Sequence, residues 1–378
     1  MKKVLEMFGE PITYGGQESV VYNMLSTFDL KNDFSIDLFT PYFADNKDLI
    51  SLILNNNGKI YTLNLPFKNF DNRFNLIKPV SKFFEECKEN YDVVHIHTGS
   101  LTTMYVFAKI AKRSGVKKVI VHSHIGLLSG GYIGKLRRLI LNVFMSRYVD
   151  VYLGCSKEAI DAKFIGKARK NAIIIHNGID IEKFKYNEKL RNEIREKYKI
   201  NNKFVLGSLG RISEQKNHIF MIDMYNDLLK ELKSKNISKD IVLLIVGGGE
   251  LLEDIKNKVM ELDLNDSVIF VGNQPDSYKF YQSFDIFLQP SIYEGLPVTA
   301  IEAQVSGLPC LLSDNISKEC AIIKEIKFLS INDEKNWIDN IIKIINTNID
   351  RESKDIDYDK FDKKKTYTII GDLYKTSI

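Results

Sequence analysis

The segment best suited to chemistry is PSIYEGLPVTAIEAQVSGLP (290–309). Glu294 ends a loop after a predicted strand, Pro297 stands near the first position of a predicted helix, and Glu302 follows within two turns. Proline at that position and Gly295 before it leave backbone amides free at the helix N-terminus, where phosphate can bind. Two carboxylates beside this end can accept hydrogen bonds from hydroxyl groups. The pattern predicts a site for a phosphorylated, hydroxyl-rich ligand, with a capped surface helix as the alternative.

A second loop with anion-binding chemistry is GRISEQKN (210–217), which also follows a predicted strand. Arg211 and Lys216 supply a planar guanidinium and a compact ammonium, a pair suited to a diphosphate. In PITYGGQES, Gly15 and Gly16 lie between a strand and a helix and would let backbone amides approach an anion. A charged surface loop and a tight turn are the respective alternatives.

All six histidines lie in or beside segments expected at a ligand-binding cleft. They are His95, His97, His122, His124, His176 and His218. His97 and His124 are the last residues of their predicted strands, so they are the better candidates for contact with a ligand. For His95 and His122, hydrogen bonding to a backbone group is the favoured interpretation.

The composition is that of an ordinary globular protein. Of the 378 residues, 44% are hydrophobic and 27% are charged, and the net charge of +4 is too small to indicate nucleic-acid binding. The four cysteines lack CxxC spacing and predict reduced thiols, not a zinc site. No apolar run reaches the roughly 18 residues of a membrane span, and Glu6 interrupts the apolar stretch that a signal peptide needs. We therefore expect a cytoplasmic protein.

Short β-rich runs alternate with helical patterns through most of the chain. The predicted strands are 3–8, 35–40, 59–63, 92–97, 117–124, 150–155 and 172–177, then 204–210, 241–247, 267–270, 285–290 and 309–313. This alternation predicts an α/β fold with parallel sheets covered by helices on both faces. Beyond residue 314 the strand signal fades, and helices are predicted at 337–347 and after Phe361.

The length favours two domains. Polar sequence around 187–202 separates the two alternating halves and predicts domains at 1–185 and 200–355. Ligands of doubly wound sheets bind beyond the carboxyl ends of the strands. Two such halves facing each other would therefore share a cleft.

Together these segments resemble the retaining nucleotide-sugar glycosyltransferases of family four, which have the GT-B fold of two Rossmann-like domains. The resemblance covers nearly the whole chain and is carried, in order, by YGGQES, HSH, CSK, HNGID, GRISEQKN, VGGGE and the Glu294–Glu302 pair. HSH and SIYEGLPVTAIEAQ are similar to the branch that builds bacterial exopolysaccharide and capsule. The last helix of the family usually crosses back to the first domain, which would assign 360–378 there.

The resemblance implies roles for the matching residues. The catalytic set would be His124, Arg211, Lys216 and Glu294. The donor would be bound by Gly15, Gly16, Gly210, Gly272, Asn273, Gln274, Gly295, Leu296, Val298 and Glu302. Tyr14, Gln17 and His97 would lie on the acceptor side.

The resemblance also implies the reaction. A sugar would move with retention from a nucleotide-sugar, most often a UDP-sugar, to a glycan or a polyprenyl-diphosphate-linked acceptor, with no metal and no other cofactor. Breaking the anomeric bond puts negative charge on the leaving diphosphate, which Arg211, Lys216 and the helix N-terminus would stabilise. No DxD motif follows a strand on the side expected to face the cleft, in keeping with a metal-free site.

Two stretches would suit an anionic membrane surface. Residues 67–84 place aromatic side chains between cations, and residues 130–148 place lysine and arginine beside leucines. Residues 109–170 carry fourteen basic and three acidic side chains. Helices packed on the first sheet and a solvated basic surface explain the same residues. The hypothesis is a peripheral contact with the inner face of the cell membrane.

Two other functions are compatible with this architecture. A UDP-sugar 2-epimerase shares the two-domain fold, but it needs acid and base residues around the sugar that this sequence does not supply. A silent partner subunit of a transferase commonly loses the glutamates or the phosphate-binding cations, and this chain keeps both.

Overall fold

In the computed structural model, the described residues are 1–67, 72–87, 89–124, 131–347, 350–351 and 358–376. The chain divides into two compact units. The first unit is Met1–Gly178 with Asp359–Ile378, and the second is Ile179–Tyr358. The boundary lies earlier than the expected 185–200, and the last helix belongs to the first unit.

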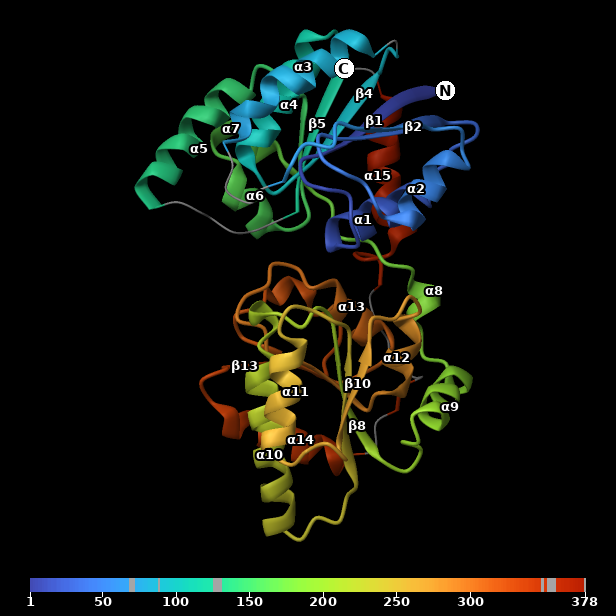
Figure 1. Cartoon of the computed structure of the whole chain (residues 1–378), viewed down its shortest axis with the longest axis vertical. Helices are drawn as coiled ribbons and strands as arrows, with labels where there is room; N and C mark the ends of the chain where they lie inside the picture. The colour runs from blue at the N-terminus through green and yellow to red at the C-terminus, as the bar shows by residue number, and fades with distance from the viewer. Residues whose placement is uncertain (68–71, 88, 125–130, 348–349, 352–357, 377–378) are drawn as a thin grey trace. The chain divides into compact units, whose positions relative to one another are not determined.

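The first unit is built on a seven-stranded sheet among the described residues, in the order β3-β2-β1-β4-β5-β6-β7 (Figure 1). Every neighbouring pair is parallel. The strands are β1 Lys2–Phe8, β2 Phe34–Thr40, β3 Ile60–Thr62, β4 Val93–His97, β5 Lys118–Ser123, β6 Val151–Gly154 and β7 Ile173–Ile174. All seven correspond to predicted strands. The order runs outward in one direction from β1 through β2 to β3, and in the other from β4 to β7. The loops that follow β1 and β4 therefore lead to opposite sides of the sheet and leave a gap between them.

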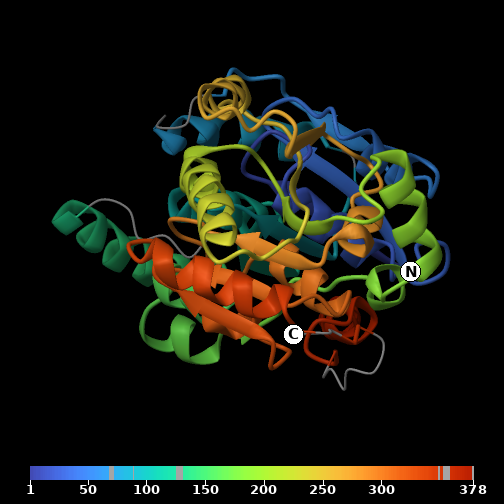
Figure 2. The same cartoon turned by 90° about the horizontal axis from the view of Figure 1, so that it is seen from below.

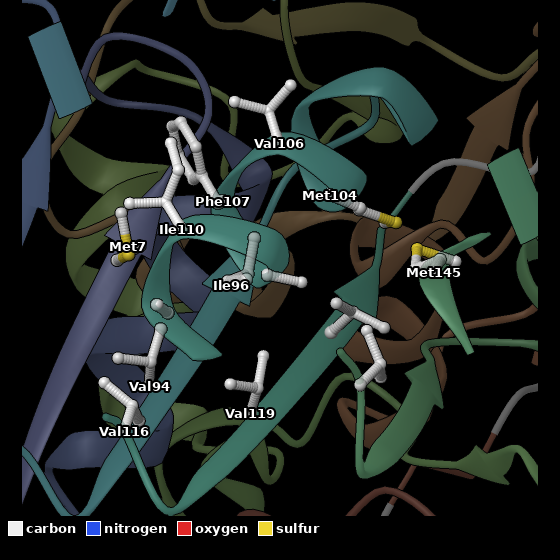
Figure 3. Packing of buried hydrophobic residues seen from close by; sticks show 14 of the residues in the cluster. Met7, Val94, Ile96, Met104, Val106, Phe107, Ile110, Val116, Val119 and Met145 are labelled. Atoms are coloured by element: carbon white, nitrogen blue, oxygen red, sulfur yellow. The ribbon is translucent and has the colours of Figure 1, made fainter. Parts of the chain in front are cut away.

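Helices cover both faces of this sheet, as predicted (Figure 1). They are α1 Gly16–Leu25, α2 Lys47–Leu54, α3 Ile77–Glu86, α4 Leu101–Arg113, α5 Gly131–Met145, α6 Lys157–Lys163, α7 Gly166–Asn171 and α15 Lys363–Lys375. A 3-10 turn, Arg73–Leu76, precedes α3. Figure 3 shows one face, where α4 packs through Phe107 and Ile110 onto strand residues such as Met7 and Ile96.

The opposite face carries a second apolar cluster, formed with α1, α2 and α15. Val4 and Phe8 of β1 point to this face and pack near Tyr374 of α15. The residue between them on the same face is Glu6, which is fully buried. Its neighbour in the register of β4 is His95. The centre of this apolar face therefore holds polar groups.

The second unit has a six-stranded parallel sheet among the described residues, in the order β10-β9-β8-β11-β12-β13. The strands are β8 Phe204–Leu209, β9 Ile241–Val246, β10 Val268–Gly272, β11 Ile286–Gln289, β12 Cys310–Ser313 and β13 Ile326–Leu329. The first five are predicted, and β13 is not. The expectation that strands end at residue 314 is wrong, because β13 is a short, half-exposed strand containing Lys327 and lacks an apolar run.

Helices also cover both faces of the second sheet (Figures 1 and 2). They are α8 Ile181–Phe184, α9 Glu188–Lys197, α10 His218–Ser234, α11 Leu252–Glu261, α12 Tyr278–Ser283, α13 Val298–Val305 and α14 Glu334–Ile345. The single tryptophan, Trp337 of α14, is fully buried in the core beneath α10, α11 and α14.

Ion pairs explain why α9 belongs to the second unit. The Asp285 carboxylate lies 2.5 Å from Arg191 Nη2 and 3.2 Å from Arg195 Nη1, and it also accepts a hydrogen bond from the Val205 amide at 2.7 Å. These contacts tie the polar segment around 187–202 to the start of β11. A hydrophilic sequence that looks like a linker is therefore a packed part of this unit.

Gly207 of β8 tests the packing of the second unit. A Cβ added there would lie 2.1 Å from Phe284 Cγ, so Gly207→Ala should cost about 3 kcal/mol of unfolding free energy through overpacking. Trp337 fluorescence during urea unfolding reports on this unit alone.

A glycine-to-alanine substitution in the first unit is the control. A Cβ on Gly371, within α15, meets its nearest atom, Phe28 Cε1, at 3.5 Å. Gly371→Ala should stabilise by about 0.5–1 kcal/mol through helix propensity and leave the Trp337 transition in place. If Gly207→Ala and the wild type unfold at the same urea concentration, the close packing of Phe284 on Gly207 is contradicted.

Candidate active site

The strand order of the second sheet reverses between β8 and β11, and the loops after these two strands meet there. The Ile292 amide donates to the Gln215 carbonyl at 2.8 Å, and Gln215 Nε2 donates to the Tyr293 carbonyl at 3.0 Å. These bonds bring the Lys216 ammonium into an ion pair with the Glu294 carboxylate. The two side chains are 18% and 12% exposed, so the pair is reachable but only slightly hydrated. Two residues predicted from separate motifs thus lie in direct contact.

Hydrogen bonds from β11 and α13 fix the position of Glu294. Gln289 Nε2 and Ser291 Oγ each donate to Glu294 Oε1 at 3.1 Å. Gln289 is held in turn, since its Oε1 accepts from Thr299 Oγ1 at 3.2 Å. The carboxylate is therefore pre-oriented, which lowers the entropy lost when a ligand hydroxyl binds to it.

The helix after this loop begins with an uncapped end. Pro297 is the N-cap residue of α13 and provides no side-chain cap, so the first amides, including that of Val298, have no side-chain acceptor. Leu296 is buried beneath the turn, whereas a Cβ on Gly295 would meet nothing within 4 Å. The space over Gly295 and the open amides can accept an anion.

Glu302 lies on the same helix in a separate environment. Tyr281 of α12 donates its hydroxyl to Glu302 Oε2 at 2.7 Å. Burial raises the pKa of Glu302 to about 7, and the Tyr281 hydrogen bond and the Lys183 charge act in the opposite direction. This carboxyl group is thus able to accept or donate a hydrogen bond near neutral pH.

Arg211 does not join the Lys216–Glu294 pair. Its side chain is 73% exposed, and Nε lies 2.9 Å from Glu250 Oε2, in the loop after β9. By contrast, the stem of Lys216 passes over Gly210, where a Cβ would lie 3.5 Å from Lys216 Cε. Gly210 has φ +146°, which favours glycine.

The three residues expected to meet a base lie at the end of β10. Gly272 adopts φ +78°, and its carbonyl accepts from the Gly247 amide at 2.9 Å. The Asn273 side chain covers Gly248, and Gln274 Nε2 donates to the Val271 carbonyl at 3.2 Å. These contacts lie at the same carboxyl edge of the sheet as Lys216.

In the first unit, the loop after β1 leads into α1. Gly15 is the extended N-cap of α1 without a side-chain cap, and a Cβ on Gly16 would meet nothing within 4 Å. Gln17 Nε2 donates to the carbonyl of His97 at 3.3 Å, which joins this loop to the end of β4. Tyr14 is 65% exposed, and its hydroxyl accepts from the Lys47 amide at 3.1 Å.

Four histidines cluster on the α15 face of the first sheet, three of them buried (His95, His97 and His122) and one half-buried (His124). His97 Nε2 lies 2.7 Å from Glu6 Oε2, and His97 Nδ1 lies 3.0 Å from His124 Nε2. His95 Nδ1 lies 2.6 Å from the Tyr374 hydroxyl, so its interpretation as a residue that satisfies a backbone group is wrong. His122 finds no hydrogen-bond partner for either ring nitrogen among the described residues, which contradicts the same interpretation for it. Imidazole nitrogens of His95, His97 and His122 lie within 4.8 Å of one another.

The remaining two histidines lie outside this cluster of four. His176 Nδ1 lies 3.1 Å from the Cys155 carbonyl, and its ring faces Phe361. His218 is buried at the start of α10, where burial lowers its pKa to about 4. The four cysteines, all among the described residues, form no disulfide, as expected.

Several polar residues of these groups are absent from the sequence prediction. They are Glu6, Gln215, Tyr281, Gln289, Ser291, Thr299 and Tyr374. Glu6 carries a usable signal, since a lone acid in the middle of an apolar strand must find a buried partner. The others depend on pairings that only the fold creates.

Family models match the two units separately. Residues 14–183 match the model described as Glycosyltransferase Family 4, and residues 191–360 match the model described as Glycosyl transferases group 1. The chain is a GT-B glycosyltransferase. The predicted fold class, two Rossmann-like domains, is therefore confirmed.

Curated relatives of this transferase align over most of its length. EpsF of Bacillus subtilis is 29% identical over 325 residues, which cover 84% of this chain and 80% of the relative. The UDP-Gal:alpha-D-GlcNAc-diphosphoundecaprenol alpha-1,3-galactosyltransferase of Escherichia coli is 27% identical over 267 residues, covering 68% and 67%.

Solved structures share the fold of this transferase at low identity. HepE of Anabaena, in complex with UDP and glucose, superposes with a TM-score of 0.73 at 15% identity, with both chains fully covered. A glycosyltransferase from Rickettsia africae gives a TM-score of 0.74 at 17% identity, covering 99% and 98%. Within the described part of the transferase, no helix combines the length and the apolar character needed to cross a bilayer.

The Tyr281–Glu302 contact gives a prediction about ionisation. Because the tyrosine hydroxyl stabilises the carboxylate, Tyr281→Phe should raise the pKa of Glu302 above its value of about 7, by roughly one unit. Carboxyl ¹³C chemical shifts followed over a pH titration measure this value. Tyr225→Phe is the matched control, since the Tyr225 hydroxyl donates to the Ile241 carbonyl. A Glu302 titration that is the same in all three proteins would contradict the assigned contact.

Proposed function

We propose that this chain is a retaining glycosyltransferase that moves a sugar from a UDP-sugar to a glycan or lipid-linked oligosaccharide acceptor in cell-surface polysaccharide biosynthesis. The observation that carries the proposal is the Lys216–Glu294 pair at the strand-order reversal of the second unit. It lies beside the uncapped start of α13, so one small region offers a cation, open amides and a hydroxyl acceptor.

The donor fits this region by charge. Lys216 and the α13 amides would neutralise the diphosphate as the anomeric bond breaks, and Glu294 would hold a sugar hydroxyl. Glu302 would bind the ribose, and the loop at Gly272 would meet the base. Arg211 would reach the diphosphate after leaving Glu250, which its exposed position allows.

Relatives support the choice of donor and acceptor. The galactosyltransferase of Escherichia coli is named for a UDP-sugar donor and a diphosphoundecaprenol acceptor. Structures of HepE hold UDP or UDP-glucose. The capsular polysaccharide biosynthesis glycosyltransferase CapH of Staphylococcus aureus is 26% identical over 295 residues. These names favour UDP and a polyprenyl-linked glycan for this chain.

Loss of either member of the pair should slow transfer strongly without unfolding the protein. Lys216→Ala and Glu294→Ala are each expected to lower kcat about 100-fold or more, since each removes a charged contact to the transition state. A thermal-shift panel of UDP-, GDP- and ADP-sugars selects the donor, and NMR of the product reports its anomeric configuration.

Lys258→Ala is the control for these variants, because it breaks a Lys–Asp pair, with Asp223, between α10 and α11. It should transfer sugar at the wild-type rate. Near-normal rates for both Lys216→Ala and Glu294→Ala, or a product of inverted configuration, would refute the proposal.

We further propose that α5 docks this transferase on anionic membrane. Arg138 Nη2 donates to the Asp161 and Phe164 carbonyls at 2.6 and 2.7 Å, and Leu141 and Met145 are buried, which fixes one side of the helix. The other side exposes apolar residues at helical spacing, together with basic ones. They are Leu136, Leu139, Ile140, Val143 and Phe144, with Lys135, Arg137 and Arg147.

Among its described residues, the stretch at 67–84 exposes two large apolar side chains, Phe74 and Ile77, against five on α5. Leu76, Val80 and Phe83 are buried against the first sheet, although Phe74 and Ile77 are partly exposed. Residues 68–71 lie outside the described residues. The helix-packing interpretation therefore holds for these three apolar residues, and the membrane proposal is confined to α5.

Vesicle sedimentation tests the membrane proposal. The wild type should bind phosphatidylglycerol vesicles at low salt, bind phosphatidylcholine weakly, and lose binding about tenfold in Val143→Glu. Leu54→Glu is the control: Leu54 of α2 is about as exposed as Val143, and this variant should bind the vesicles like the wild type. If Val143→Glu and Leu54→Glu bind the vesicles equally well, the membrane proposal for α5 is contradicted. A dimer in sedimentation velocity that Val143→Glu dissociates would instead make α5 a contact between two copies of the chain.

A further inference from the structure

Two imidazoles in the core of the first unit have ring nitrogens without a hydrogen-bond partner. Among the described residues, His122 has no partner for Nδ1 or Nε2, and His95 has none for Nε2. Both side chains are at most 1% exposed, so water in the surrounding solvent does not reach them. A buried polar atom that leaves its hydrogen bonds to water unreplaced destabilises the fold. Three such atoms in one cluster indicate that a bound group completes it.

The pairing of two parallel strands places these rings side by side. His95 and His97 are two residues apart on β4 and share one face of the sheet, and His122 of β5 is the register partner of His97. One imidazole nitrogen from each of these three histidines lies within 4.8 Å of the other two. Two nitrogens bound to a tetrahedral zinc ion are about 3.3 Å apart. Small rotations of the side chains would therefore close this set around one ion.

Tyr374 of α15 fixes the proton on His95. The Tyr374 hydroxyl donates its single proton to Glu6 Oε1 at 2.7 Å. His95 Nδ1, which lies 2.6 Å from the Tyr374 oxygen, must therefore be the donor in that contact. A neutral imidazole with its proton on Nδ1 carries its lone pair on Nε2, which is the unpartnered atom. His95 thus holds a lone pair that a metal ion can accept.

His97 has the outer contact typical of a metal ligand. Its Nε2 lies 2.7 Å from Glu6 Oε2, and metal-bound histidines usually keep their second nitrogen on a carboxylate or carbonyl, which fixes the ring. His97 can therefore bind an ion through Nδ1. His124 Nε2 lies 3.0 Å from that Nδ1 atom, close to the spacing of two zinc ligands, so His124 is placed to be a fourth ligand.

We propose that His95, His97 and His122 bind one zinc ion inside the first sheet, with His124 as the fourth ligand. Imidazole nitrogen suits zinc and its neighbours in the transition series, whereas magnesium and calcium prefer oxygen. Four protein ligands make a closed site, which is the structural kind. The Glu6 carboxylate, hydrogen-bonded to His97, supplies negative charge beside the buried cation.

The ion would have a structural role that is independent of sugar transfer. It would connect β4 to β5 and, through Glu6 and Tyr374, would fix the position of α15. Because His95, His97 and His122 are at most 1% exposed, the ion must enter before the first unit closes. A chelator added to the folded protein should therefore remove zinc only slowly, and metal exchange requires unfolding.

Refolding of the full-length chain tests the site. Protein unfolded in urea with a chelator, then refolded without the chelator in Zn²⁺, should retain about one zinc ion per chain after desalting, and Mg²⁺ should not be retained. The zinc-refolded protein should melt about 5 °C or more above protein refolded without metal. X-ray absorption at the zinc edge should show imidazole nitrogens at about 2.0–2.1 Å as the main ligands. A wild-type chain that retains no zinc, or zinc bound mainly by oxygen, would overturn the proposal.

His122→Leu separates a metal site from a polar cluster that binds no ion. This variant lacks one ligand, so it should lose the bound zinc and the zinc-dependent rise in melting temperature. Refolded without metal, it should melt no lower than the wild type, because it also removes two buried nitrogens that have no partner among the described residues.

His176→Asn is the matched control, since His176 belongs to the same unit and contacts the Cys155 carbonyl outside the cluster. It should keep both the zinc and the rise in melting temperature. Equal zinc content in His122→Leu and the wild type would place the ion elsewhere on the chain and overturn the proposal. If His122→Leu does not fold, the zinc content and the absorption spectrum of the wild type still decide.

Discussion

Contact between Lys216 and Glu294 is the interaction on which the candidate site depends. The two residues come from loops that follow different strands, and they meet because the strand order of the sheet reverses between β8 and β11. Backbone bonds of Gln215 to Ile292 and Tyr293 hold the loops together. The Glu294 carboxylate holds the Lys216 ammonium in one position, so this cation is fixed by the fold itself. Pre-positioned charge is the most effective kind for stabilising a leaving group.

The predicted strands were recoverable from sequence because a parallel sheet covered on both faces needs continuous apolar runs. The run IVLLIV at 241–246 is short and rich in β-branched residues, which favours a fully buried strand, and the structure has β9 there. β13 was missed for the same reason, since an edge strand with Lys327 and partial exposure does not need such a run. The polar segment around 187–202 was expected to separate the two domains, but its arginines pair with Asp285 of the second unit, and charge alone does not reveal that partner.

Motifs predicted Lys216, Glu294 and the α13 turn, because a tight turn into a helix N-terminus has local requirements for glycine and proline. They did not locate Gln289 or Tyr281, which orient the carboxylates through bonds between elements. Glu6 was the hardest to interpret: its hydrogen-bond donor Tyr374 is 368 residues away in the sequence. In a chain read one residue at a time, Glu6 only interrupts an apolar stretch. In the fold, it is the centre of the most polar part of an otherwise apolar core.

The return of α15 to the first unit has a consequence for biosynthesis. The second unit is one uninterrupted segment, whereas the first unit contains both ends of the chain. Tyr367, Ile370 and Tyr374 complete the apolar cluster beneath β1, and they follow the whole second unit in the sequence. On a ribosome, the usual N-terminal-first order of folding is therefore reversed. The second unit can close before α15 has been made, and one face of the first sheet stays uncovered until then, which gives chaperones time to bind it.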